Sequence, residues 1–584
     1  MVSQRQLLVS SEIVCDIETN GLRPTKIHCM VANGEVITTR EQAHEWAKVH
    51  KGSTVYFHHG YGFDFPVINR IWGLNLLDTF VCRDTLVLSR LANPQREGGH
   101  SLEAWGQRLG YPKVEHEDWE TYTPEMLNRC RTDVELTKKV LDTVRMELDG
   151  FSDESIQLEH DVARIIAKQE QTGWLLNQEL CFDLLGELKE RQFEVEAEVH
   201  TRFVPRCKKV REISPKIKKD GAMSSVGLKF LGDECLDIVG GSFTRVDFPE
   251  FNLGSRQQIA EYLIHFGWKP KKTTEKGNVI VDETTLEGVD IPEAQLIAEY
   301  LMLGKRIAQV QSWLELVEED GRVHGQVNSC GAVTNRMTHY NPNMAQVPAS
   351  RKPYGDRCRQ AWTVPKGYKV VGCDANALEL VCLAHYMDDP EYTESVANGT
   401  QEEGTDVHTR NQRAAGLPTR DAAKTFCYAF LYGAGDAKIG SIVGGSATDG
   451  RKLKAQFLKQ TPALADLRNK VETAARRGWL KGLDGRRIKV LSQHAALNTL
   501  LQSAGAIIMK RALVILDEQI KARGLDAKFI MNCHDEFQLE VREDHVSTML
   551  WLAPSCIAAA GQYYNLRCPL SGSAAAGDNW HDTH

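Results

Sequence analysis

Two aspartates that stand far apart in the sequence each lie at the end of a strand-like run, and this pair constrains the fold more than any other feature. Asp374 directly follows the apolar run Val370–Cys373, and Asp535 stands in the segment AKFIMNCHDEFQLEVR, which is typical of a strand, a turn and a second strand. Carboxylates at two strand ends can hold a pair of cations for nucleotidyl transfer only if the tertiary structure brings them together. Taken alone, the sequence HDE is more typical of an ordinary polar hairpin turn.

A four-residue spacing of cations and aromatics favours the catalytic interpretation over the hairpin turn. In RDAAKTFCYAFLYGAG, the side chains of Arg420, Lys424, Tyr428 and Tyr432 would form one slowly drifting stripe on a helix. Arginine offers a bidentate fork, lysine a point charge and tyrosine a stacking plane, so the stripe suits a triphosphate beside a stacked base. A solvated face with two core tyrosines would explain the aromatics but leave the cations without a role.

A second group of carboxylates lies near the N-terminus. Asp16 and Glu18 end an apolar run, and on a strand residues i and i+2 point to the same face. This pair alone is more typical of a solvated turn. Asp64, after a strand-like run, and Asp133, on a predicted helix, would complete a set of four oxygen ligands of the kind that two-metal phosphodiester hydrolysis requires.

Composition excludes several classes of protein. The 584 residues carry a net charge of -8 with 42% hydrophobic and 25% charged residues, which predicts several ordinary globular domains rather than a disordered or fibrous chain. No apolar run approaches about 20 residues and the N-terminus lacks a signal-peptide core, so we expect no membrane association. Fifteen cysteines without any CxxC pair argue against a zinc ribbon or a disulfide framework and favour a reducing compartment, the cytoplasm.

The chain divides into regions of different character. Residues 1–150 alternate strand-like and helical runs, which predicts an α/β domain. Long helices follow, and a Gly- and Pro-punctuated stretch at 202–254 begins with eight Lys and Arg against two acids up to Asp220. Helical periodicity returns from about 255. We therefore expect boundaries near 150 and within 202–254.

The motifs resemble two known families. The segments around Asp374, Arg420–Tyr432 and Asp535 resemble motifs A, B and C of family A DNA polymerases, and GQVNSCGAVTNRMTHYNPNMAQVP resembles the TGR segment of that family with Asn335 in place of Gly. The four N-terminal acids, together with DTLVLSRL and HSLEAWGQRLG, resemble the DEDD proofreading exonucleases. HAALNTLLQSAGA and the terminal GDNWHDTH look like the replicative polymerases of short-tailed phages that borrow host thioredoxin. The resemblance covers residues 12–584.

The resemblance implies a fold and an activity. It implies an α/β, RNase H-like 3′–5′ exonuclease domain over residues 1–150, followed by an α+β right-hand polymerase domain over 151–584. The expected parts of that second domain are a thumb at about 151–330, a palm with an antiparallel sheet at 331–405 and 485–584, and helical fingers at 406–484. The implied function is template-directed extension of a primer 3′-hydroxyl with dNTPs in phage replication, in the host cytoplasm.

The resemblance also implies a role for each site residue. Asp374 and Asp535 would hold two Mg²⁺ ions with the Ala375 carbonyl, and Glu536 would support them. The exonuclease acids would hold two more Mg²⁺ ions. The expected dNTP-binding residues are His408, Arg420, Lys424, Tyr428 and Tyr432, together with Glu379 as the group that excludes a ribose 2′-hydroxyl. The expected contacts to the primer terminus and the minor groove of the DNA are Arg336, Gln502 and His534.

Two departures from the exonuclease pattern predict a weakened first site. His59 stands where that family usually has Asn, and Arg129 stands where it usually has Tyr or His. The aromatic group helps to orient the attacking water, and a guanidinium has no acceptor with which to replace it. We expect metal binding to survive and hydrolysis to be weakened or lost.

The sequence constrains the protein partners less than it constrains the substrates, which are primer-template DNA and dNTPs. The insertion at 202–254 falls where the phage enzymes bind thioredoxin, but its basic part could equally clamp duplex DNA, dock another processivity factor or be a solvated loop. A second basic cluster, Lys269, Lys271, Lys272 and Lys276, is also open to the solvated-loop interpretation. A replicative helicase and primase are further partners that the resemblance implies.

Three alternatives remain. A single-subunit RNA polymerase uses similar carboxylates and a similar cationic helix, but Glu379 and the four N-terminal acids argue against it. A DEDD nuclease with an accessory domain leaves the stripe from Arg420 to Tyr432 unexplained. A catalytically silent DNA clamp has no need for both Asp374 and Asp535.

Overall fold

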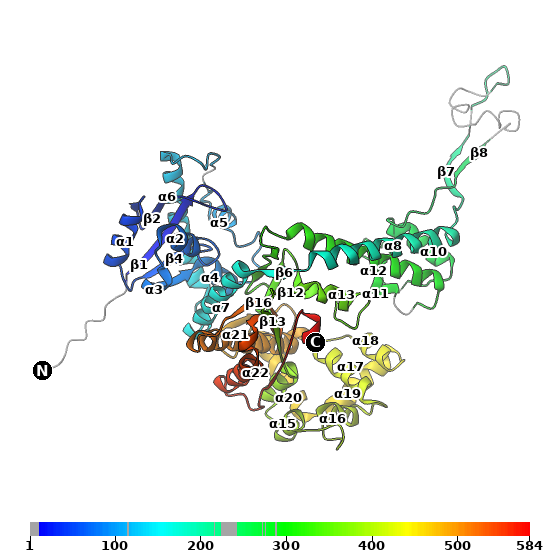
Figure 1. Ribbon diagram of the computed structural model, residues 1–584. Helices are drawn as coiled ribbons and strands as arrows, with labels where there is room; N and C mark the ends of the chain where they lie inside the picture. The colour runs from blue at the N-terminus through cyan, green and yellow to red at the C-terminus, as the bar shows by residue number, and fades with distance from the viewer. Residues whose placement is uncertain are drawn as a thin grey trace. The chain divides into compact units, whose positions relative to one another are not determined.

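The computed structural model describes residues 11–113, 116–214, 216–222, 242–270, 272–274, 276–286 and 289–584. The chain forms two compact units, one of residues Met1–Leu176 with Leu316–His584 and the other of Asn177–Glu315. The first unit contains both groups of carboxylates, and it is described first (Figure 1).

The N-terminal part of the first unit is a five-stranded sheet with helices on both faces. The strand order is β3-β2-β1-β4-β5, with β1 antiparallel to β2 and parallel to β4. The strands are β1 (Glu12–Thr19), β2 (Ile27–Ala32), β3 (Glu35–Ile37), β4 (Thr54–Phe57) and β5 (Val81–Asp84). The helices are α1 (Arg40–Val49), α2 (Asp64–Trp72), α3 (Leu76–Thr79), α4 (Thr85–Ala92), α5 (Leu102–Leu109) and α6 (Pro124–Glu147).

The side chains of β1 point alternately to the two faces of the sheet, which explains why helices cover both faces. Ile13, Cys15 and Ile17 pack into one apolar core with α1 and α2, whereas Val14 packs into a second core with α4, α5 and α6. Because successive side chains of a strand point to opposite faces, one buried strand serves both layers. The predicted α/β architecture of this region is confirmed.

Helix α7 (Asp153–Thr172) connects this sheet to the rest of the first unit. Leu158, Val162 and Ile165 lie in the large apolar core of the C-terminal region, while Ala167 packs against the core of the N-terminal sheet. The compact second unit begins only at Asn177 and ends at Glu315, within the range of 151–330 expected for the thumb. The second unit begins later than the expected residue 151 because the apolar side chains of α7 are buried in the first unit.

The two aspartates of the C-terminal region lie on a four-stranded antiparallel sheet with the order β16-β17-β13-β18. The strands are β13 (Tyr368–Ala375), β16 (Ala527–Cys533), β17 (Glu536–Arg542) and β18 (Gly572–Gly577). Helices α14 (Leu378–Met387), α21 (Ala496–Ala522) and α22 (Val546–Tyr563) contribute to the same core as the sheet. This is the antiparallel sheet predicted for the palm.

The stretch Gln493–Ala522, which includes α21, is long and apolar enough to cross a membrane by length and composition alone. However, 83% of its most apolar window is buried inside the protein, which identifies it as a core helix.

Short elements complete this region. Strands β6 (Trp174–Leu176), β9 (Arg322–Val323) and β12 (Trp362–Thr363) form a sheet in the order β12-β6-β9, and β10 (Gln326–Asn328) pairs with β11 (Thr338–Tyr340). Helix α13 (Gly355–Gln360) and the 3₁₀ turns η2 (Met344–Gln346), η3 (Gln493–Ala495) and η4 (Glu543–His545) occupy the connections, and η5 (His581–Thr583) follows β18.

A helical lobe follows α14, in the region predicted as fingers (Figure 1). Its elements are α15 (Pro390–Ala397), α16 (Val407–Ala415), α17 (Arg420–Leu431), α18 (Asp436–Ile442), α19 (Ala447–Gln460) and α20 (Pro462–Ala475), with β14 (Trp479–Lys481) and β15 (Arg487–Lys489). Thr419 caps the start of α17 by accepting from the Ala422 N–H, and Gly433, with φ +74°, follows its end. The helix buries Phe426, Cys427 and Phe430, so the predicted stripe lies on its other face.

The second unit is helical with one projecting ribbon. Helix α8 (Gln178–Arg202) is joined to α12 (Pro292–Leu316) by the ion pair of Arg191 with Glu299 at 2.8 Å. The remaining elements are α10 (Arg256–His265), α11 (Glu283–Leu286) and the antiparallel ribbon of β7 (Lys208–Ile213) and β8 (Phe243–Asp247). The ribbon belongs to the predicted insertion, of which residues 215 and 223–241 lie outside the described residues, as does Lys271 of the second basic cluster.

Candidate active sites

The register of the C-terminal sheet brings Asp374 and Asp535 together. Asp374 lies directly opposite Glu536, and the Ala375 N–H donates to the Asp535 carbonyl at 3.0 Å. The turn between β16 and β17 consists of His534, with φ +58°, and Asp535. Burial, the charge of Asp535 and the charge of Glu536 raise the pKa of Asp374 to about 7. The convergence on which the sequence argument depends is therefore present in the structure.

This pair of aspartates fits hard divalent cations. Asp374 is exposed and Asp535 is half-buried, and partial burial raises the pKa of Asp535 as well as that of Asp374. Adjacent carboxylates in a partly desolvated site repel one another, and a divalent cation held between their oxygens would remove that cost.

Glu536 has a different environment from the two aspartates. Its Oε1 accepts from Gln538 at 2.6 Å and from the indole N–H of Trp580 at 2.8 Å, and it lies 3.0 Å from Nε2 of His584. Burial alone would raise the pKa of Glu536, but the interactions with His584, Gln538 and Trp580 outweigh it and lower that pKa. The C-terminal segment thus holds Glu536 beside the aspartates. Nothing in the local sequence around Trp580 or His584 indicates this contact with Glu536.

Glu379 connects three elements of the site. It lies in the first turn of α14, where its Oε2 accepts from the Tyr432 hydroxyl at 2.7 Å and its Oε1 from the Arg336 guanidinium at 3.2 Å. The rings of Tyr428 and Tyr432 are stacked, with centroids 6.3 Å apart. The acid, the two aromatics and the predicted DNA contact Arg336 form one connected group.

The turn before Arg336 explains the residue that replaces Gly in the TGR-like segment. Asn335 has φ +59°, and its N–H donates to the Ala332 carbonyl at 2.8 Å while the Ala332 N–H donates to the Arg336 carbonyl at 3.2 Å. Among residues other than glycine, asparagine adopts this left-handed conformation most readily. The substitution therefore preserves the turn.

The predicted triphosphate-binding residues lie on α16 and α17. His408 is in the first turn of α16, and its ring lies 6.2 Å from that of Tyr428. Burial, with the charges of Arg420 and Lys424, lowers the pKa of His408. The side chain of Lys424 is exposed. These four residues surround one region of the helical lobe.

Asp406 joins two of these residues, and the sequence analysis did not identify it. Its Oδ1 accepts from the His408 N–H at 3.1 Å, as the N-cap of α16, and from Nε of Arg420 at 3.0 Å. Burial would raise the pKa of Asp406, but hydrogen bonds from Thr409, Arg420 and the His408 N–H lower it to about 2. The N-cap position was the only signal in the sequence.

The remaining predicted DNA contacts lie near the Asp535 turn. Arg336 and His534 line one cavity together with Ala506 of α21, and burial and the charge of Arg336 lower the pKa of His534. Gln502 is half-buried on α21, one helical turn before Ala506. The three predicted contacts therefore come from three elements around one part of the structure.

The N-terminal carboxylates form a second site. Oxygens of Asp16, Glu18 and Asp133 lie within 4.8 Å of one another, and Asp64 begins α2 beside them. Burial and the charges of neighbouring acids raise the pKa of Asp16 well above its usual value and that of Asp64 to about 8. Burial raises the pKa of Glu18 to about 7 despite the charge of Arg129. The cluster has the ligand types and spacing that a divalent cation needs.

Two basic side chains are paired with this cluster. Nζ of Lys113 lies 2.7 Å from Oδ2 of Asp133, and Nε of Arg129 lies 3.2 Å from Oε1 of Glu18. His59 lines the same cavity with φ +72°. Nothing in the sequence pointed to Lys113.

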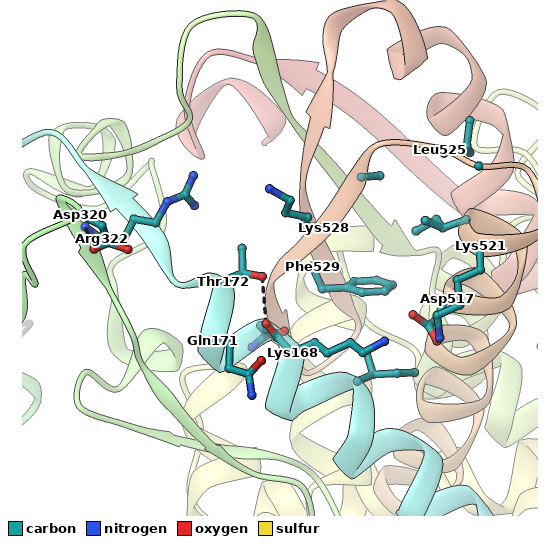
Figure 2. A pocket seen from close by; sticks show the side chains of 15 residues that line it. Lys168, Gln171, Thr172, Asp320, Arg322, Asp517, Lys521, Leu525, Lys528 and Phe529 are labelled. Atoms are coloured by element: carbon teal, nitrogen blue, oxygen red, sulfur yellow. Dashed lines mark hydrogen bonds and ion pairs between the residues drawn. The ribbon is translucent and has the colours of Figure 1, made fainter. Parts of the chain in front are cut away.

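A further cavity, of about 660 Å³, lies at the far end of β16 from Asp535 (Figure 2). Arg322 and Lys528 point toward one another in it, and both pair with the buried Glu540, at 2.7 and 3.8 Å. Lys521 is paired with Asp517. None of the predicted site residues lines this cavity.

Comparisons with known proteins identify the family of the chain. Residues 233–582 match the family described as DNA polymerase family A. The DNA-directed DNA polymerase of Enterobacteria phage T3 is 36% identical over 98% of this chain and 100% of its own length, and that of Escherichia phage T7 is 36% identical over the same shares.

A solved structure shows the same fold. The polymerase domain of Pol1 from M. smegmatis, in complex with DNA primer-template and dNTP, has a TM-score of 0.77 at 20% identity, covering 98% of this chain and 97% of that one. Together with the sequence matches, this confirms the right-hand polymerase fold and a metal-dependent enzyme. The chain belongs to family A of the DNA polymerases, and its activity is template-directed DNA synthesis.

Proposed function

We propose that Asp374 and Asp535 hold two Mg²⁺ ions, with the Ala375 carbonyl as a further ligand and Glu536 as a neighbour that supports the site. When bound, the ions would stabilise the attacking 3′-oxygen and the leaving phosphate of the nucleotidyl transfer. The observation that carries this proposal is the register that sets Asp374 opposite Glu536, next to Asp535. Oxygen-only ligands favour Mg²⁺ over softer metals.

The dNTP would bind between the helical lobe and these aspartates. Arg420, Lys424 and His408 would contact the triphosphate, and Tyr428 and Tyr432 would flank the nascent base pair. Glu379 would exclude a ribose 2′-hydroxyl. The stacked tyrosines and the hydrogen bond between Tyr432 and Glu379 support these roles.

The primer-template would be read in its minor groove. Arg336, Gln502 and His534 would contact acceptors that every correct base pair presents there, so checking would not depend on sequence. Because other contacts would go to phosphates, binding should weaken as salt rises.

Primer extension with the Asp535→Asn variant tests the polymerase site. We expect loss of nearly all extension, whereas Asp544→Asn, an exposed aspartate on η4, should extend as the unchanged protein does. Extension that survives Asp535→Asn would refute the assignment. Running dNTPs beside rNTPs in the same assay also tests the RNA polymerase alternative.

We further propose that the N-terminal domain is a 3′–5′ exonuclease whose metal-binding acids are Asp16, Glu18, Asp64 and Asp133 and whose hydrolysis is weak. The cluster of three carboxylates supports metal binding, and Arg129 beside Glu18 supports weak hydrolysis. Digestion of single-stranded 3′ ends by the purified protein measures the rate of this hydrolysis. Efficient digestion that Asp16→Ala abolishes would show that the hydrolysis is not weakened.

For the insertion at 202–254 we propose a processivity partner, thioredoxin or another small protein. The ribbon of β7 and β8 exposes most of its side chains, including Val210 and the nearby Phe248, and an isolated two-stranded ribbon is only marginally stable. Primer extension with and without thioredoxin, after a DNA trap, tests this. Equal product lengths would exclude thioredoxin. Because the similar polymerases are phage proteins, we place the reaction in the host cytoplasm with a replicative helicase and primase.

A further inference from the structure

The exonuclease site contains two positively charged side chains as well as its four acids. One cavity of about 530 Å³ is lined by all six side chains, Asp16, Glu18, Asp64, Asp133, Lys113 and Arg129. When the four carboxylates are ionised, as metal binding requires, they carry four negative charges, and the lysine and arginine carry two positive ones. The net charge of the ionised set is therefore −2, which one divalent cation balances.

The charged side chains of Lys113 and Arg129 are both partly buried. The Arg129 side chain is 13% exposed and its guanidinium lies over the Trp119 ring, 5.0 Å from the centroid. The Lys113 side chain is 28% exposed. Partly buried ion pairs are screened less than surface pairs, so these positive charges act strongly on the carboxylates beside them.

The two ion pairs do not use up the oxygens of the acids. Lys113 lies against Oδ2 of Asp133, and within the described part of the chain Oδ1 of Asp133 accepts no hydrogen bond. Oε1 of Glu18 faces Nε of Arg129 at 3.2 Å, and oxygens of Asp16, Glu18 and Asp133 still lie within 4.8 Å of one another. Free oxygens therefore remain for a metal even with both cations in place.

A second divalent cation would meet a different charge balance. With one bound the ionised site is neutral, and with two it carries a net charge of +2 inside a largely desolvated cavity, which is costly. Two-metal hydrolysis relies on one ion at the attacking oxygen and one at the leaving oxygen.

We propose that the exonuclease site binds a single divalent cation, with Lys113 and Arg129 supplying the charge of the second. The inference rests on the proposed exonuclease assignment and gives its weak hydrolysis a cause: neither an ammonium nor a guanidinium can ligate and activate a water as a metal ion does.

The test counts bound Mn²⁺ ions, by electron paramagnetic resonance and by calorimetry, in the full-length protein. Asp374→Asn with Asp535→Asn forms the background, because it removes the two aspartates proposed to hold metal in the polymerase site. We expect one Mn²⁺ that Asp16→Ala abolishes, and two in the background that also carries Lys113→Met and Arg129→Tyr. The same two changes should raise the rate of 3′-end digestion about tenfold or more, which corresponds to a barrier lower by at least about 1.4 kcal/mol.

Matched changes on α6 outside the lining of the cavity, Arg131→Tyr with Lys138→Met, should leave one ion bound. If the double variant fails to fold, Lys113→Met and Arg129→Tyr are measured singly, and each should bind a second ion more tightly than the background does. Two bound Mn²⁺ ions in the background protein would overturn the inference and leave the exonuclease assignment standing. A single bound ion in the variants that lack Lys113 and Arg129 would have the same consequence. No ion sensitive to Asp16→Ala would overturn both.

Discussion

The Tyr432 hydroxyl donates a hydrogen bond of 2.7 Å to Oε2 of Glu379, joining the end of α17 to the first turn of α14. The carboxylate is held at the same time by Arg336 at 3.2 Å. A side chain fixed from two sides can exclude a substrate hydroxyl by its position, because it cannot turn away without losing both contacts.

We therefore expect Glu379→Ala to raise ribonucleotide incorporation relative to deoxynucleotide incorporation by about 10- to 100-fold, the range typical of small steric differences in a pocket. Tyr432→Phe, which removes only the hydroxyl, should give a smaller rise. The measurement is the ratio of kcat/KM for rATP and dATP. An unchanged ratio in Glu379→Ala would exclude the residue as the gate.

Tyr428 predicts ready use of dideoxynucleotides. The resemblance to family A implies that a tyrosine rather than a phenylalanine at this position goes with weak discrimination against chain terminators, since a phenol hydroxyl can offer a hydrogen bond that the missing 3′-hydroxyl cannot. Tyr428→Phe should increase discrimination about tenfold or more, equivalent to at least about 1.4 kcal/mol. Competition between ddNTP and dNTP in single-nucleotide extension measures it. Strong rejection by the unchanged protein, with no effect of the substitution, would contradict the prediction.

Asp406 should position Arg420 and His408 for the triphosphate. Asp406→Ala removes both the cap of α16 and the partner of Arg420, so we expect the KM for dNTP to rise about tenfold, equivalent to about 1.4 kcal/mol of lost binding. Asp406→Asn keeps an acceptor for the His408 N–H and should raise KM less.

Steady-state kinetics that separate KM from kcat, with the Kd for primer-template as control, test the role of Asp406. A loss of kcat alone, or equal effects of Asp406→Ala and Asp406→Asn, would count against a positioning role.

Asn335 should tolerate glycine but not alanine. Its φ of +59° is accessible to Gly without strain, whereas Ala in the left-handed region costs about 1–2 kcal/mol. We expect Asn335→Ala to lower the free energy of unfolding by about that amount and to weaken primer-template binding through the displaced Arg336. Asn335→Gly should stay close to the unchanged protein. Urea unfolding and DNA binding by anisotropy measure the two effects, and equal behaviour of both variants would refute the strain argument.

Acid should destabilise the junction between α7 and the N-terminal sheet. His160 of α7 accepts from the Asp84 N–H at 3.1 Å, and burial, with the charge of Arg83, lowers the pKa of His160 to about 4. Because the unfolded chain takes up this proton first, the contribution of His160 is fully present above about pH 6.5 and falls by up to about 1.4 kcal/mol per pH unit down to about pH 4.

Urea unfolding at about pH 7.5 and pH 5 should therefore show a smaller acid loss in His160→Gln than in the unchanged protein, since glutamine does not titrate. Other buried histidines leave a residual dependence in both. Equal losses in the two proteins would show that His160 does not titrate in this way.

Local sequence was enough to predict the elements that carry the site. The apolar run before Asp374 forms β13, the segment around Asp535 forms two strands and a turn, and the stripe from Arg420 to Tyr432 lies on one face of α17 and at its C-cap. Each of these follows from periodicity and turn chemistry within a few neighbouring residues.

Other features required contacts between residues far apart in the chain. The pairing of Asp406 with Arg420, of Lys113 with Asp133 and of Glu536 with the C-terminal segment leaves no periodic signal, because each partner has an ordinary local sequence. The start of the second unit at Asn177 likewise depends on where the apolar face of α7 is buried, since helical periodicity shows that a face is apolar but not what covers it.

The sequence by itself determined which strands, turns and helices carry the acids, cations and aromatics, because those elements form from interactions between near neighbours. Only the tertiary structure decided which charges meet: the register of β13 against β17 sets Asp374 beside Asp535, and packing sets Arg129 against Glu18. The physical reason is that the energy of a buried charge depends on its distance to other charges and on the solvent excluded around it, and long-range packing alone determines both.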